Sequence, residues 1–165
     1  MPISDQGVSH DRYAVIPRTA IFLRRGDSFL LLKGASTKRL WANKYNGLGG
    51  HVERGEDVLS SAKRELQEET GLTADLWLCG TLIVDAGTMG IALYLFTGES
   101  PEGEPVPSKE GGAEWIPFDR LSTLPVVEDV PILLSKIRHM TRGDAAFSAR
   151  SYYDDRERLI VEFAK

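Results

Sequence analysis

The sequence contains a single cysteine, Cys79, and no long hydrophobic run. One cysteine excludes an internal disulfide and any zinc site built from several cysteines, and we expect its side chain to pack in the core. No stretch approaches the roughly 18 consecutive apolar residues that a membrane-spanning helix needs. Residues 1–11 are polar and lack the pattern of a secretory signal. We therefore expect a cytoplasmic protein with no membrane as a partner.

The sequence also lacks an excess of positive charge, because its formal net charge is −4 over 165 residues. A broad nucleic-acid-binding surface requires such an excess, so we expect no nucleic-acid polymer as a partner. A small polyanion can still bind where metal ions or a few lysines and arginines neutralise it. The apolar fraction of 42% and the charged fraction of 27% are those of a globular domain, which excludes wholesale disorder.

Apolar, β-rich segments separated by turn residues predict one domain over residues 1–165. We expect strands at 19–23, 29–32, 76–85, 91–96 and 113–118, and helices at 57–70 and 130–140. We expect residues 1–12 to be a flexible arm and residues 143–165 to be a C-terminal hairpin extension, with strands at 147–153 and 159–163. This pattern predicts an α+β fold with one helix on each face of the sheet.

The helix predicted at 57–70 carries three glutamates on one face. Glu65, Glu68 and Glu69 are spaced so that 3.6 residues per turn place their side chains within an arc of roughly 100°. Beside them runs an apolar stripe made of Leu59, Ala62 and Leu66. We therefore expect the carboxylates to be half-buried, where unpaired charge is costly. A hard cation such as Mg²⁺ or Mn²⁺ would stabilise this array, and the alternative is a solvated acidic face.

Residues 50–72, with the sequence GHVERGEDVLSSAKRELQEETGL, resemble the Nudix box at every fixed position. The flanking segments Ala42-Asn43-Lys44, Leu48-Gly49-Gly50, Lys109-Glu110-Gly111 and Glu114-Trp115 resemble the MutT-like branch of that superfamily, which includes 8-oxo-dGTP diphosphatases. The similarity covers residues 17–140. It implies the Nudix fold, an α/β/α sandwich with a mixed central β-sheet, and Mg²⁺-dependent hydrolysis of a nucleoside diphosphate linked to another group.

The resemblance also implies roles for individual residues. The metal ligands would be Glu65, Glu68, Glu69 and Glu110 together with the carbonyl of Gly49. The catalytic residues would be Arg64, Glu65, Glu68 and Glu110. Arg64 would orient a carboxylate and pair with Glu56, and one of the glutamates would act as the base.

Five residues are candidate substrate contacts: Arg39, Asn46, Gly50, His51 and Asp129. Asn46 either contacts a base edge or forms a turn with Gly47. Asp129 either selects the base, as its position in the resemblance implies, or caps the second helix. Further candidates are Lys33, Lys38 and Lys44, which could contact phosphate, and Trp41, which either stacks on a base or anchors its loop.

These features predict a metal-dependent pyrophosphohydrolase that converts a nucleoside triphosphate, such as an oxidised purine nucleotide, to the monophosphate and pyrophosphate. Its cofactor would be Mg²⁺, with Mn²⁺ as a substitute, and it would act as a monomer or a homodimer. One alternative is a hydrolase of ADP-ribose or of dinucleoside polyphosphates. Another is a non-catalytic nucleotide sensor, which the intact set of carboxylates disfavours.

Overall fold

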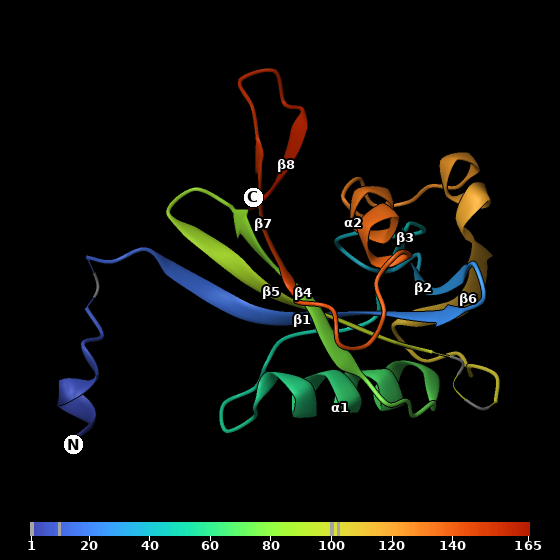
Figure 1. The fold of residues 1–165 in the computed structure, drawn as a ribbon, viewed down its shortest axis with the longest axis horizontal. Coiled ribbons are helices and arrows are strands. Elements are labelled where there is room, and N and C mark those ends of the chain that lie inside the picture. The colour runs from blue at the N-terminus through green and yellow to red at the C-terminus, as the bar shows by residue number, and fades with distance from the viewer. Residues whose placement is uncertain (1, 10, 100, 102) are drawn as a thin grey trace.

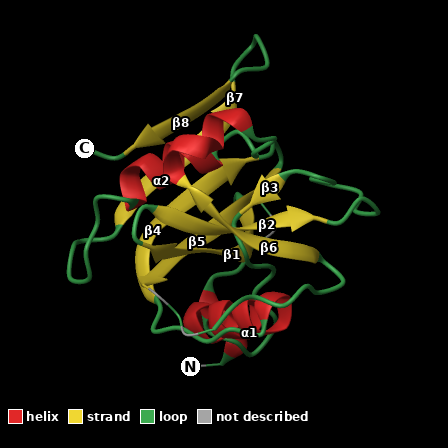
Figure 2. Ribbon diagram, turned by 90° about the vertical axis from the view of Figure 1, so that its right-hand side faces the viewer, coloured by secondary structure: helices red, strands yellow, loops and turns green. Residues whose placement is uncertain are grey.

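The computed structural model describes residues 2–9, 11–99, 101 and 103–165. A curled, eight-stranded mixed sheet lies between two helices (Figure 1). Helix α1 (Val58–Thr70) covers one face and helix α2 (Val130–Ile137) covers the other, as Figure 2 shows from the side. The predicted α+β fold with a mixed central sheet is confirmed. Among the described residues, no helix has the length and apolar character needed to cross a bilayer.

The strands are β1 (Ala14–Arg25), β2 (Ser28–Gly34), β3 (Tyr45–Asn46), β4 (Trp77–Asp85), β5 (Met89–Glu99), β6 (Gly111–Pro117), β7 (Phe147–Tyr153) and β8 (Leu159–Phe163). Their order in the sheet is β3-β2-β1-β5-β4-β7-β8, and β6 pairs with β2. β1 runs parallel to β5, and β4 runs parallel to β7. The strands predicted at 76–85 and 91–96 correspond to β4 and β5, which form a long antiparallel pair.

Two apolar cores attach the helices to the sheet. Leu66 of α1 packs in one core with Ile21 of β1, and Leu133 of α2 packs in the other with Phe22 of β1. Neighbouring residues of β1 therefore serve opposite cores, as the two-residue period of a strand requires. Cys79 is buried in the α2 core as expected, and this burial raises the pKa of its thiol to about 12.

The first strand is longer than predicted. β1 begins at Ala14 rather than at residue 19, because Ala14 already pairs with Met89 of β5. This partner is distant in sequence, so the local pattern does not reveal it. Within the predicted arm, Ile3–Gln6 form a short 3₁₀ helix, whereas residues 1 and 10 lie outside the described part.

The end of α2, the end of β5 and the start of β6 also differ from the predicted bounds. α2 ends at Ile137 rather than at residue 140, although Met140 is buried in the same core. β5 extends to Glu99 rather than ending at residue 96. β6 begins at Gly111, two residues early, because Gly111 pairs with Gly34 of β2.

The C-terminal hairpin has the predicted strand bounds, and it continues the main sheet. β7 pairs with β4 from Gly80 to Val84, and β8 pairs with β7. Ala149 of β7 is buried in the α2 core, and Phe163 of β8 packs against that core. The hairpin therefore shares its hydrophobic core with the rest of the sheet.

Candidate functional site

A glycine-containing segment, residues 48–51, lies antiparallel beside β1 and is held there by its backbone. The amide of Thr19 donates a hydrogen bond of 2.8 Å to the carbonyl of Gly50. Gly49 has a φ of 128°, and a Cβ there would collide with the carbonyl of Thr19, so only glycine fits. A Cβ on Gly50 would lie 2.5 Å from Oε1 of Glu65. Gly49 therefore lets the segment lie close to β1, and Gly50 lets the carboxylate of Glu65 approach the segment closely.

Helix α1 is capped at both ends, by Asp57 and by Gly71. The Asp57 side chain accepts two hydrogen bonds of 2.9 Å, one from the amide of Leu59 and one from the amide of Ser60. Gly71 ends the helix with a φ of 72°, in the left-handed conformation that glycine adopts readily. These caps fix the register in which the helix presents its glutamates.

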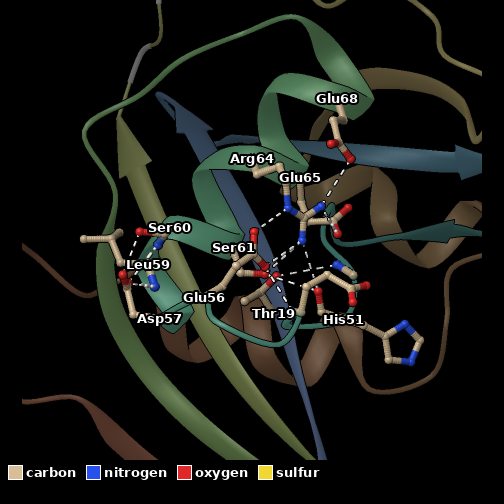
Figure 3. Close-up of polar contacts among 12 residues, drawn as sticks. Thr19, His51, Glu56, Asp57, Leu59, Ser60, Ser61, Arg64, Glu65 and Glu68 are labelled. Atoms are coloured by element: carbon tan, nitrogen blue, oxygen red, sulfur yellow. Dashed lines mark hydrogen bonds and ion pairs between the residues drawn. The ribbon is translucent and has the colours of Figure 1, made fainter.

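Arg64 connects the glutamates of the site. Its Nε and Nη2 donate hydrogen bonds of 2.7 and 3.0 Å to the two carboxylate oxygens of Glu56. The predicted pairing of Arg64 with Glu56 is therefore confirmed. The Nη1 of Arg64 donates hydrogen bonds to Glu65, at 2.8 Å, and to Glu68, at 3.2 Å. Its Nη2 also donates a hydrogen bond to the carbonyl of His51 (Figure 3). The guanidinium lowers the pKa of Glu56 to about 2, so this carboxylate is charged at neutral pH.

The three glutamates of the acidic face differ in exposure. Glu69 is 4% exposed, and its Oε2 accepts a 2.8 Å hydrogen bond from the amide of Gly49. This burial raises the pKa of Glu69 to about 7. The side chain of Glu65 is 15% exposed, whereas that of Glu68 is 61% exposed. The expectation of half-buried carboxylates was wrong for Glu68, which lies on the solvent side of the arc.

Glu110 reaches the site from the loop before β6. Lys38 Nζ lies 2.7 Å from Oε2 of Glu110, and this ion pair lowers the pKa of the carboxyl group. The amide of Ala35 also donates to the carbonyl of Glu110 over 3.0 Å. These contacts tie the loop after β2 to the loop before β6.

These groups line one cavity of about 470 Å³, which we call the carboxylate cavity. Its lining includes Gly49, Gly50, His51, Arg64, Glu65, Glu68, Glu69 and Glu110, all of them residues that the sequence singled out. In the described part of the chain, no three His, Cys, Asp or Glu side chains are already placed as ligands around one point. Arg64 binds Glu65 and Glu68, and Lys38 binds Glu110. Carboxylate oxygens are nevertheless the donors that Mg²⁺ and Mn²⁺ prefer.

A second cavity of about 190 Å³, here called the sheet cavity, opens against the α2 face of the sheet. Asn46 and Asp129 line it, together with the apolar side chains Leu32, Val84, Ile91, Leu93 and Val127. Asp129 makes no capping hydrogen bond with its side chain, so the capping interpretation was wrong. Burial raises the pKa of its carboxyl group. Asn46 accepts a hydrogen bond from the amide of Gly47 and lies in β3 rather than in an isolated turn.

The loop between β2 and β3 contributes unevenly to the two cavities. Lys38, Trp41 and Lys44 line the sheet cavity, whereas Arg39 is exposed and lines neither cavity. The side chain of His51 is also exposed. Other residues of the predicted loop therefore line the cavities, but the structure does not bring Arg39 to either of them.

Arg18, a residue of β1 that lines both cavities, was not predicted from the sequence. It occupies the same face of the strand as Ala20 and Phe22, which point into the α2 core. A charged residue in phase with inward-facing residues was the available signal.

Comparison with known proteins gives consistent matches. Residues 15–135 match the family model of the NUDIX domain. An oxidized purine nucleoside triphosphate hydrolase of Danio rerio is 32% identical over 117 residues, which are 67% of this chain and 75% of that protein. An NAD-capped RNA hydrolase, NudC, of Pseudomonas aeruginosa is 30% identical over 141 residues, covering 83% of this chain and 49% of that protein. The crystal structure of a MutT protein from Bacillus halodurans superposes with a TM-score of 0.74 at 25% identity, covering 90% of this chain and 97% of the other.

Proposed function

This chain belongs to the Nudix hydrolase family, and we propose that it converts nucleoside triphosphates to nucleoside monophosphates and pyrophosphate. One observation carries the proposal. The carboxylate cavity is lined by Glu65, Glu68, Glu69 and Glu110 and by glycines of the segment 48–51. The sheet cavity adjoins the carboxylate cavity. The first cavity offers ligands for the phosphates and their counter-ion, and the second offers an apolar site with polar groups for a base.

Hydrolases of this family generally use divalent metal cations, and we propose Mg²⁺, with Mn²⁺ as a substitute. The residues that would hold it are Glu65, Glu68, Glu69 and Glu110, with the carbonyl of Gly49. This donor set consists of oxygen atoms only, which fits a hard cation. When bound, such an ion neutralises phosphate oxygens and lowers the pKa of a coordinated water.

The chain itself supplies orientation and proton transfer. Arg64 holds Glu65 in place through a guanidinium that Glu56 fixes from the opposite side. One carboxylate of the cavity takes the proton of the attacking water. Hydrolysis adds this water across a P–O–P bridge, so that one phosphoryl group stays on the nucleoside and pyrophosphate leaves. No side chain forms a covalent intermediate.

We further propose that the base binds in the sheet cavity and that its preferred substrate is an oxidised purine nucleotide. The Danio rerio relative is named as an oxidized purine nucleoside triphosphate hydrolase. Asn46 offers both a donor and an acceptor to a base edge, and the buried Asp129 offers a carboxyl group. We expect Asp129→Asn to raise the KM for the preferred nucleotide about tenfold or more, with kcat within a few-fold. Steady-state kinetics measure both values, and an unchanged KM would remove Asp129 from the base site.

The test of the proposed function is product analysis with Mg²⁺ and a panel of substrates. The panel contains ordinary and oxidised nucleoside triphosphates, ADP-ribose, dinucleoside polyphosphates and NAD-capped RNA. We expect monophosphate and pyrophosphate from a triphosphate, and a loss of at least about 100-fold in kcat for Glu68→Gln. Preferential cleavage of another compound of the panel would show that the substrate of this chain belongs to the class of that compound. Absence of all hydrolysis, with nucleotide binding retained, would favour the sensor.

A further inference from the structure

The two cavities share a boundary on β1 and α1. Four residues line both of them: Arg18, Lys38, Gly49 and Glu69. Arg18 and Lys38 are the two cations of this group. A substrate that spans both cavities must pass these side chains at the point where its nucleoside joins its phosphates.

Lys38 is already neutralised within the protein, because its Nζ lies 2.7 Å from a carboxylate oxygen of Glu110. Arg18 is in the opposite situation. Among the described residues its side chain makes no ion pair, and its Nε is buried without a hydrogen-bond partner. A buried donor without an acceptor costs free energy, and most such donors in folded proteins have a partner.

Three of the glutamates that line the carboxylate cavity with Arg18 are bound to other groups. Glu69 accepts from the amide of Gly49, Glu65 accepts from Arg64, and Glu110 is held by Lys38. Arg18 is therefore a cation at the junction of the two cavities whose guanidinium is left for an external anion. Its backbone is fixed, since residue 18 lies within β1 and bridges to His51 on the glycine segment.

Resting on the proposed function, we propose that Arg18 binds the phosphate group attached directly to the nucleoside, the one that remains on the monophosphate product. The planar guanidinium presents paired N–H donors that match two oxygens of a phosphate. This contact sets the position of the nucleotide along the cleft. It also predicts that Arg18 distinguishes a nucleoside monophosphate from the nucleoside that lacks the phosphate.

The experiment compares the wild type, Arg18→Gln and Arg18→Lys by isothermal titration calorimetry. The probes are the monophosphates of guanosine, adenosine, cytidine, uridine, thymidine and 8-oxo-deoxyguanosine, and the six nucleosides themselves. Titrations run with Mg²⁺ and again with EDTA. For the monophosphates that bind, we expect Arg18→Gln to weaken binding roughly tenfold or more in both conditions while leaving nucleoside affinity unchanged. Arg18→Lys keeps the charge but loses the planar donors, so its affinity should be intermediate.

Arg156→Gln is the matched control, because Arg156 is exposed in the turn between β7 and β8. It removes the same charge and should leave every affinity unchanged. Equal loss of nucleoside and monophosphate affinity in Arg18→Gln would overturn the proposal, as would no loss of monophosphate affinity. It would also be overturned if the wild type bound every monophosphate no more tightly than its nucleoside. Hydrolysis by the wild type is measured separately, so failure of the proposed function is distinguished from failure of this inference.

Discussion

Arg64 shows how one side chain organises the site. Arg64 lies in α1, but Glu56, with which it forms two hydrogen bonds, lies in the segment before the helix. The bidentate pair fixes the guanidinium, which then reaches Glu65 and the carbonyl of His51. Geometry of this kind is specific to arginine, because its donors lie in one plane.

The Glu56–Arg64 pair gives a pH-dependent prediction. The pKa of Glu56 is about 2 in the folded protein and 4.5 for an unperturbed glutamate. The pair therefore contributes stability above about pH 4.5 and loses that contribution as the pH falls towards 2. We expect Glu56→Gln to unfold at lower urea concentration than the wild type at pH 6, and the difference to shrink below pH 4.5.

The matched control for this prediction is Glu53→Gln, since Glu53 is exposed three residues away. It should unfold like the wild type throughout the pH range. A difference between Glu56→Gln and the wild type that stayed constant from pH 6 to pH 3 would show that the charge of Glu56 does not cause it.

At the residue scale, the motif predicted the acidic half of the site better than the basic half. The spacing of Glu65, Glu68 and Glu69 follows from one helix, so their common face could be read directly from the sequence. Arg18 and Arg39 depend on which strand and loop meet in the fold. Sequence reasoning therefore chose Arg39 from a basic loop and missed Arg18, which lies in a strand.

At the scale of the element, α1 is encoded almost entirely by its own residues. Asp57, Gly71 and the stripe of Ala62 and Leu66 are local signals, and the observed start differs from the predicted one by a single residue. The ends of β1 and β6 depend on partners far away in the sequence, Met89 and Gly34. For this reason the predicted bounds of these strands were less accurate.

The apolar face of α1 should carry most of its stability. Leu66 is 1% exposed and packs in the core beneath the helix. We expect Leu66→Ala to lower the free energy of unfolding by about 2–5 kcal/mol, because it removes buried methyl groups and leaves a cavity. Urea denaturation measures this loss. Lys63→Ala, on the exposed face of the same helix, should change it by less than about 0.5 kcal/mol, and equal effects of the two variants would contradict the packing described here.

At the scale of the whole molecule, one continuous sheet joins the site to the C-terminal hairpin. β7 covers the edge of β4, and its Ala149 is buried in the core beneath α2. This core also contains Val127 and Val130, on either side of Asp129. The hairpin therefore supports the wall of the sheet cavity.

Removal of this hairpin should destabilise the entire protein. We expect a chain ending at residue 140 to lose at least about 10 °C in Tm or to aggregate, because the α2 core and the edge of β4 become exposed. Deletion of residues 2–9 is the control, since this segment is not part of the sheet. Thermal unfolding compares the two, and a shortened chain with the Tm of the wild type would show that the hairpin is dispensable.

Divalent ion binding in the carboxylate cavity is the central claim, and calorimetric titration with Mg²⁺ in the presence of a non-hydrolysable triphosphate tests it most directly. We expect the wild type and Asp155→Asn, a variant in an exposed turn, to bind Mg²⁺ equally. Glu68→Gln should bind at least about tenfold more weakly, since it removes one anionic ligand. The claim is contradicted if the wild type takes up no Mg²⁺, or if Glu68→Gln binds it as tightly as the wild type.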